Sequence, residues 1–199
     1  MEQIISKEEL DKINEVQGEI RGLSFKIIED FVLKEEGAEG LKKIKEVIAG
    51  LNFPRKDEKI RATDFYPLSL FSFKFLVMQK LFHYNDKKLQ EIGSFRAKSS
   101  LLTRLFMRYF VSLEKVEKEA QEMWRKTTTV GNIEVVKVNE KEKHIVLRLK
   151  NYNLHPDQCH IFKGLFSTII QMIVKDPVVC EETKCIFLGD SCHEFSLKW

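Results

Sequence analysis

Hydrophobic residues in the first two thirds of the chain recur at three- and four-residue spacing, which predicts amphipathic helices. The first helix is expected to begin at a capping box at Ser6 and to run to about Lys34, with Gly37 and Gly40 ending it. Further helices are expected at residues 41–51, 67–82, 93–110 and 112–126. The polar stretch 52–64 predicts a surface loop or linker.

From residue 127 onward the hydrophobic period changes to that of β-strands. The segment 144–150 alternates as in a half-buried strand, with Ile145, Leu147 and Leu149 facing one way and Val146, Arg148 and Lys150 the other. Strands are expected at residues 133–138, 144–150, 178–188 and 192–197, with an apolar helix at 160–174. Helices followed by hairpin, helix and hairpin predict an α+β fold, in which N-terminal helices pack on an antiparallel sheet of about four strands.

Composition and charge exclude several classes of protein. The 33 basic and 30 acidic residues are well mixed, whereas a nucleic-acid-binding protein would show a clustered basic face. No run of about 20 apolar residues predicts a membrane span, and the N-terminus lacks the layout of a signal peptide. We therefore expect a cytoplasmic protein that binds no nucleic acid. In a reducing compartment cysteines are metal ligands or reactive thiols more often than disulfides.

All four cysteines lie between positions 159 and 192, which suggests a shared role. Cys159 is at the start of an expected helix, where the helix dipole favours a thiolate. Cys185 and Cys192 flank the last expected hairpin, and a two-residue turn at Gly189 and Asp190 would place them on one face. Three converging thiolates suit a soft, tetrahedral metal ion, with zinc as the default.

The fourth ligand is left open by the spacing. Cys180, Glu182, His160 and His193 all lie nearby in the sequence. In an unbroken strand Cys180 and Glu182 would point away from Cys185, so either would need a bulge to join it. Because the chain has no C-x-x-C pair, buried inert cysteines and a redox pair remain alternatives to a metal site.

The last 75 or so residues resemble the 4-vinyl reductase domain family, whose wider fold includes haem-based nitric-oxide sensors and TRAPP vesicle-tethering subunits. The resemblance rests on Cys-His-Ile-Phe-Lys-Gly at 159–164 and on Cys-Ile-Phe-Leu-Gly-Asp-Ser-Cys-His-Glu-Phe at 185–195. It implies a structural zinc ion held by Cys159, Glu182, Cys185 and Cys192, and an irregular strand near the acidic ligand. It also implies a ligand-binding α+β domain at residues 52–199, preceded by a helical segment at 1–51.

The 15 phenylalanines predict either an aromatic core or a ligand cavity. The residues expected to line such a cavity are Phe71, Phe75, Phe106, Phe110, Trp124, Phe162 and Phe166. The resemblance implies a hydrophobic or aromatic small molecule as the ligand.

The function expected on these grounds is a non-enzymatic sensor domain that binds a hydrophobic small molecule and forms a homodimer. No motif supplies a hydride carrier or an obvious acid, and no histidine is in the context of a haem ligand. A scaffold or assembly protein acting through helix-mediated dimerisation, as in TRAPP, is the alternative. An accessory role in tetrapyrrole metabolism is a third.

Overall fold

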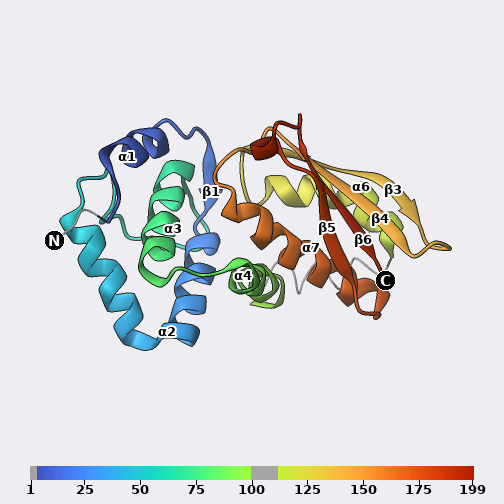
Figure 1. Ribbon diagram of the computed structural model, residues 1–199, viewed down its shortest axis with the longest axis horizontal. Coiled ribbons are helices and arrows are strands. Elements are labelled where there is room, and N and C mark those ends of the chain that lie inside the picture. The colour runs from blue at the N-terminus through green and yellow to red at the C-terminus, as the bar shows by residue number, and fades with distance from the viewer. Residues whose placement is uncertain (1–3, 100–111) are drawn as a thin grey trace. The chain divides into compact units, whose positions relative to one another are not determined.

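The computed structural model describes residues 4–99 and 112–199, and the chain forms two compact units, Met1–Asn85 and Asp86–Trp199. Figure 1 shows the helices and strands of both units. The boundary expected after residue 51 falls inside the first unit, in the loop after its long helix. Among the described residues, no helix is long and apolar enough to cross a membrane.

The N-terminal unit is mainly helical. Its elements are α1 (Lys7–Asn14), β1 (Glu19–Arg21), α2 (Leu23–Gly50), β2 (Phe65–Pro67) and α3 (Leu68–Phe82). Ser6 caps α1 in the expected capping box, and its side chain accepts a hydrogen bond from the backbone N–H of Glu9. The core contains edge-to-face ring pairs, such as Phe25 with Phe71 at 5.2 Å between ring centroids.

The single helix expected from Ser6 to Lys34 is wrong, because the chain leaves the helix after Asn14. Gly18 has a φ of 93°, and the chain then forms β1, which pairs antiparallel with β2. The break expected at Gly37 is a kink inside α2, where φ is 69°, and the helix continues through Gly40. The helix expected at 67–82 is confirmed as α3.

The C-terminal unit is a four-stranded antiparallel sheet covered by helices, which confirms the predicted α+β class. Its elements are α4 (Asp86–Ser99), α6 (Leu113–Arg125), β3 (Asn132–Asn139), β4 (His144–Lys150), α7 (Asp157–Val174), β5 (Val179–Lys184) and β6 (His193–Lys198). The strands lie in the order β3-β4-β6-β5. Of the helix expected at 93–110, residues 100–110 lie outside the described residues.

One face of the sheet carries the core of this unit. The alternation in β4 buries Ile145, Leu147 and Leu149 against α6 and α7, which lie across that face (Figure 1). On β6, Phe195 and Leu197 belong to the same core and are fully buried. The intervening side chains face away from the core, so helix α7 is fixed to the sheet by apolar packing.

Helices α4 and α7 approach each other closely through glycine. A Cβ atom on Gly93 would lie 1.9 Å from the carbonyl oxygen of Ile161, and one on Gly164 would lie 1.9 Å from that of Gln90. Ser94 donates a hydrogen bond to the carbonyl of Gly164 at 3.3 Å across the same contact. The absence of two side chains therefore allows backbone contact between the helices.

The last hairpin is less regular than expected. The pairing of β5 with β6 shifts register between Glu182 and Lys184, which marks a bulge at Thr183. A short 3-10 helix, η1 (Ile186–Leu188), follows β5, and Gly189 has a φ of 99°. The expected two-residue turn is therefore wrong, since eight residues separate β5 from β6.

Candidate functional site

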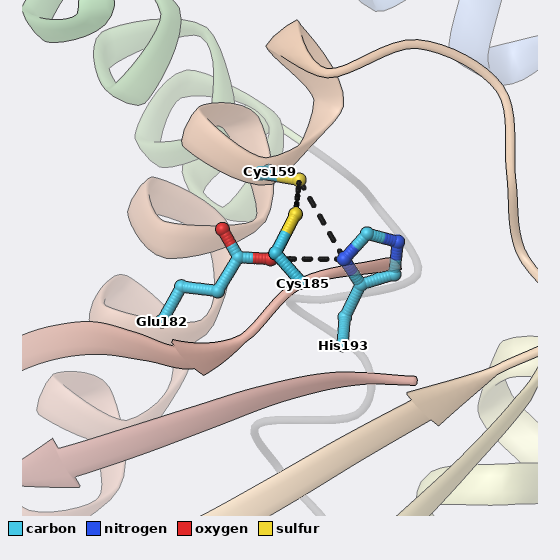
Figure 2. A group of neighbouring side chains, drawn as sticks. All are labelled: Cys159, Glu182, Cys185 and His193. Carbon is cyan, nitrogen blue, oxygen red and sulfur yellow. Dashed lines mark hydrogen bonds and ion pairs between the residues drawn. The ribbon is translucent and has the colours of Figure 1, made fainter. Parts of the chain in front are cut away.

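Four side chains from three segments of the C-terminal unit converge near the start of α7. Each of Cys159, Glu182, Cys185 and His193 offers one ligand atom, and these atoms all lie within 4.8 Å of one another. Figure 2 shows Cys159 on α7, Glu182 on β5, Cys185 just after β5 and His193 on β6, all pointing toward one centre. The two thiols and the imidazole are buried, and the carboxylate is partly buried.

Local structure explains why the two residues from the β5 side meet. The bulge at Thr183 changes the alternation of β5, so that Glu182 and Cys185 face the same centre although they are three positions apart. Beyond β5, the backbone N–H of Cys185 donates to the Asp190 carboxylate at 2.8 Å, and the N–H of Asp190 donates to the Cys185 carbonyl at 3.2 Å. Asp190 thus holds the loop that presents the Cys185 thiol.

Two of the ligand-atom distances match edges of a tetrahedral metal site, and a third is shorter. A thiolate–metal bond of about 2.3 Å implies about 3.8 Å between two thiolate sulfurs and about 3.6 Å between a sulfur and an imidazole nitrogen. The Sγ atoms of Cys159 and Cys185 are 3.7 Å apart, and Cys159 Sγ is 3.6 Å from His193 Nδ1. Glu182 Oε1 lies 2.9 Å from His193 Nδ1, a hydrogen-bond distance that is about 0.5 Å shorter than the corresponding tetrahedral edge.

The imidazole of His193 is oriented by a hydrogen bond from Nε2, the ring nitrogen that points away from the cluster. Nε2 lies 3.1 Å from the backbone carbonyl of Tyr152, which can only accept, so Nε2 carries a proton. A proton then lies between Nδ1 and the Glu182 carboxylate at 2.9 Å, and its loss would leave an Nδ1 lone pair directed at Glu182 and Cys159. A ligating histidine in proteins commonly has this second hydrogen bond to a backbone carbonyl.

Electrostatics within the cluster disfavour a second negative charge unless a cation is present. Burial and the nearby Glu182 carboxylate raise the pKa of the Cys159 thiol, so the thiolate expected at the helix start is not favoured by the protein alone. Burial also acts to raise the pKa of Glu182, but hydrogen bonds from His193, Cys159 and Cys185 outweigh it and leave this pKa lowered. The four side chains therefore need either shared protons or a bound cation to lie this close together.

The structure brings together three of the four metal ligands expected from the sequence. Cys192 lies outside the group of converging ligand atoms, and His193, one of the candidates left open, lies inside it. Because β6 alternates, His193 shares the core-facing side with Phe195, while Cys192 has the parity of Glu194 on the opposite side. Cys180 also lies outside the cluster, and burial raises its pKa to about 12, as for an inert core thiol.

The aromatic residues expected to line one cavity lie in different places. Trp124, Phe162 and Phe166 pack together in the core of the C-terminal unit, with 5.7 Å between the rings of Trp124 and Phe162. Phe71 and Phe75 line a cavity of about 580 Å³ in the N-terminal unit. The other two, Phe106 and Phe110, lie outside the described residues.

The fold is similar to that of solved H-NOX proteins. An H-NOX protein from S. oneidensis in the Fe(II)NO ligation state is 15% identical with a TM-score of 0.63, over 90% of this chain and 98% of that chain. A triple mutant of an S. oneidensis H-NOX protein in the Fe(II) state gives a TM-score of 0.69 at 15% identity, over 90% and 95%. Fe(II) unliganded H-NOX from K. algicida gives 0.63 at 13% identity, over 90% and 96%. No family model and no curated protein match the chain.

These comparisons correct two expectations from the sequence. The resemblance to the 4-vinyl reductase domain family is wrong, because the matching structures are H-NOX proteins. Zinc as the cofactor is overturned by the same structures, which are described in Fe(II) states and in connection with heme. At 13–15% identity the likeness shows the fold, and each cofactor has to be tested against the residues of this chain.

The cavity described in the N-terminal unit does not fit a heme. Heme iron takes an axial ligand, most often a histidine, beside an apolar cavity. This cavity is lined by no His, Cys or Tyr, and Met78 supplies the one sulfur atom of its lining. None of the chain's five histidines lies at positions 100–111, and those outside the cluster are His83, His144, His155 and His160. His144 is hydrogen-bonded to Ser196, and His160 lies 3.6 Å from Asp86.

Proposed function

We propose that the chain is a non-enzymatic sensor domain whose C-terminal unit binds one divalent transition-metal ion through Cys159, Glu182, Cys185 and His193. The observation that carries the proposal is the convergence of these four ligand atoms within 4.8 Å. Two thiolates, an imidazole and a carboxylate together suit soft or borderline divalent ions. The ligand set defines this class of ion and leaves its identity to measurement.

A bound ion would resolve the electrostatics of the cluster. A divalent cation lowers the pKa of a coordinating thiol and releases its proton. The same ion would take the place of the proton shared between His193 and Glu182, which are 2.9 Å apart. Binding would then tie α7 to β5 and β6, because the ligands come from all three segments.

The ligand set also supports binding without catalysis. Catalytic metal sites usually keep an open position, whereas four protein ligands fill a tetrahedral ion. The fold likeness to Fe(II)NO and Fe(II) H-NOX proteins supports a role in sensing a small molecule. A hydrophobic ligand, a homodimer and a cytoplasmic location stay predictions, as do the scaffold and tetrapyrrole roles.

Titration of the metal-free chain with Co²⁺ tests the proposal. We expect one equivalent to produce thiolate-to-cobalt absorption in the near ultraviolet and the intense visible bands of a four-coordinate ion. Cys159→Ser and Cys185→Ser should lose the thiolate absorption in part, and the double variant should lose it completely. His193→Ala should weaken binding while keeping both thiolates.

Two matched controls distinguish this site from a general affinity of thiols. Cys180→Ser and Cys192→Ser each remove one cysteine outside the cluster, so both should bind Co²⁺ like the unaltered chain. If Cys192→Ser lost the thiolate absorption and His193→Ala kept full affinity, the proposed ligand set would be wrong. If the unaltered chain gave no absorption at all, the metal-binding proposal would fail.

A further inference from the structure

The N-terminal unit contains a second candidate site, the cavity of about 580 Å³ between α2, α3 and the loop that follows α2. This volume lies in the range of small-molecule sites. Phe25, Val32, Phe71, Phe75 and Met78 form buried apolar walls. The cavity therefore has the size and the lining of a site for an apolar molecule.

One charged side chain of this cavity lacks an ion-pair partner. Lys74 is only partly exposed on α3, and among the described residues no carboxylate lies within ion-pair distance of its Nζ. Its recorded contact is with the ring of Phe25, whose centroid is 5.9 Å from Nζ. Burial lowers the pKa of Lys74, which means that its charge is poorly solvated where it lies.

The acidic residues around the cavity do not compensate this charge at contact distance. Glu29 pairs with Lys26 at 3.1 Å, and Glu58 pairs with Arg55 at 2.5 Å through Oε1, while its buried Oε2 has no hydrogen-bond partner among the described residues. Across the whole lining, five lysines face three acidic residues, so the cavity has an excess of positive charge. An anion that enters the cavity thus finds a cation without a close partner.

We infer that this cavity binds an apolar carboxylic acid, whose carboxylate accepts a hydrogen bond from the Lys74 ammonium while its hydrocarbon body contacts the phenylalanines. The inference extends the proposed function by naming the class of molecule that is sensed. It depends on residues of the N-terminal unit only, whereas the metal cluster lies in the C-terminal unit, so either proposal can fail without the other.

Calorimetric titration of the full chain with decanoate, and with decanol as an uncharged probe of equal length, tests the inference. We expect decanoate to bind and Lys74→Met to weaken it about tenfold, the order given by a hydrogen bond between charged groups. Lys74→Arg should restore most of the affinity. Lys45→Met removes an exposed lysine of the same lining and should leave decanoate affinity unchanged.

Three results separate the outcomes. A tenfold loss for decanoate in Lys74→Met, with decanol binding unaltered, supports the inference. Equal decanoate affinity in Lys74→Met and in the unaltered chain overturns it, as does the failure of decanoate to bind. Co²⁺ binding, measured on the same variants, should be unchanged in every case, and its loss would show that the N-terminal substitution had disturbed the whole chain.

Discussion

The contact between α4 and α7 gives the most direct test of the fold that positions the cluster. Gly164 of α7 lies against the backbone of α4, so that an added Cβ would lie 1.9 Å from the carbonyl oxygen of Gln90. Because the colliding atom belongs to the backbone, no side-chain rotation relieves the contact. Gly164→Ala should therefore force the two helices apart by about 1 Å, since contacts below 3.0 Å do not occur for real Cβ atoms.

The expected cost follows from two opposing effects. Overpacking of a close contact costs about 1–3 kcal/mol, and backbone displacement places this contact at the upper end. Alanine is favoured over glycine inside a helix by about 1 kcal/mol, which offsets part of the cost. We expect a net loss of about 2 kcal/mol in the free energy of unfolding, or about 4–8 °C in the melting temperature for a chain of this size.

Thermal and urea unfolding, followed by circular dichroism, measure this change. Gly50→Ala is the matched control, because Gly50 ends α2 and no atom lies within 4 Å of the position of its added Cβ. That variant should be neutral or stabilised by up to about 1 kcal/mol. If Gly164→Ala proved as stable as Gly50→Ala, the close approach of α4 and α7 would be refuted.

Three further changes test other parts of the structure. Hydrogen bonds from Arg148 lower the pKa of Glu194, so Glu194→Gln should lower the free energy of unfolding by about 1 kcal/mol at pH 7. Urea unfolding should show that the difference between the variant and the unaltered chain disappears as the pH falls through and below 4. Asp190→Ala removes the carboxylate that accepts a hydrogen bond from the backbone N–H of Cys185, and it should weaken Co²⁺ binding about tenfold. A smaller effect would mean that the loop is ordered without this carboxylate. Tyr84→Phe removes a 3.0 Å hydrogen bond to a carboxylate of α2 and should lower the free energy of unfolding by about 1 kcal/mol, and an unchanged urea midpoint would contradict that contact.

Much of the fold could be predicted because one-sided burial leaves a period in the sequence. Residues 144–150 alternate strictly, and the structure buries every second one of them in β4. The helix expected at 160–174 is present as α7, three residues longer at its start. The helix expected from Ser6 to Lys34 failed because Ile20 continues the helical spacing, although Gly18 turns the chain into β1.

The cluster could be predicted only in part, since its geometry depends on irregular backbone. The clustering of cysteines indicated Cys159 and Cys185. The alternation of side chains along a strand indicated that Glu182 could join them only beside a bulge. His193 was among the candidates for the fourth ligand, but the loss of Cys192 from the ligand set was not predicted, because a 3-10 helix replaces the expected tight turn. A single-residue change of register moves a side chain to the other face of a strand.

The aromatic residues illustrate a different limit. Composition indicated that the phenylalanines form either a core or a cavity, and both occur. Phe162 and Phe166 stack in the core of the C-terminal unit, whereas Phe71 and Phe75 line the cavity of the N-terminal unit. Hydrophobicity alone does not distinguish these roles, because both environments favour the same side chains.

Native mass spectrometry of the untreated full chain tests the central claim most directly. The account predicts one divalent transition-metal ion per chain, retained in Cys180→Ser and lost in the double variant Cys159→Ser, Cys185→Ser. A chain that carried heme, or one whose mass showed no metal while the protein remained folded, would contradict the account.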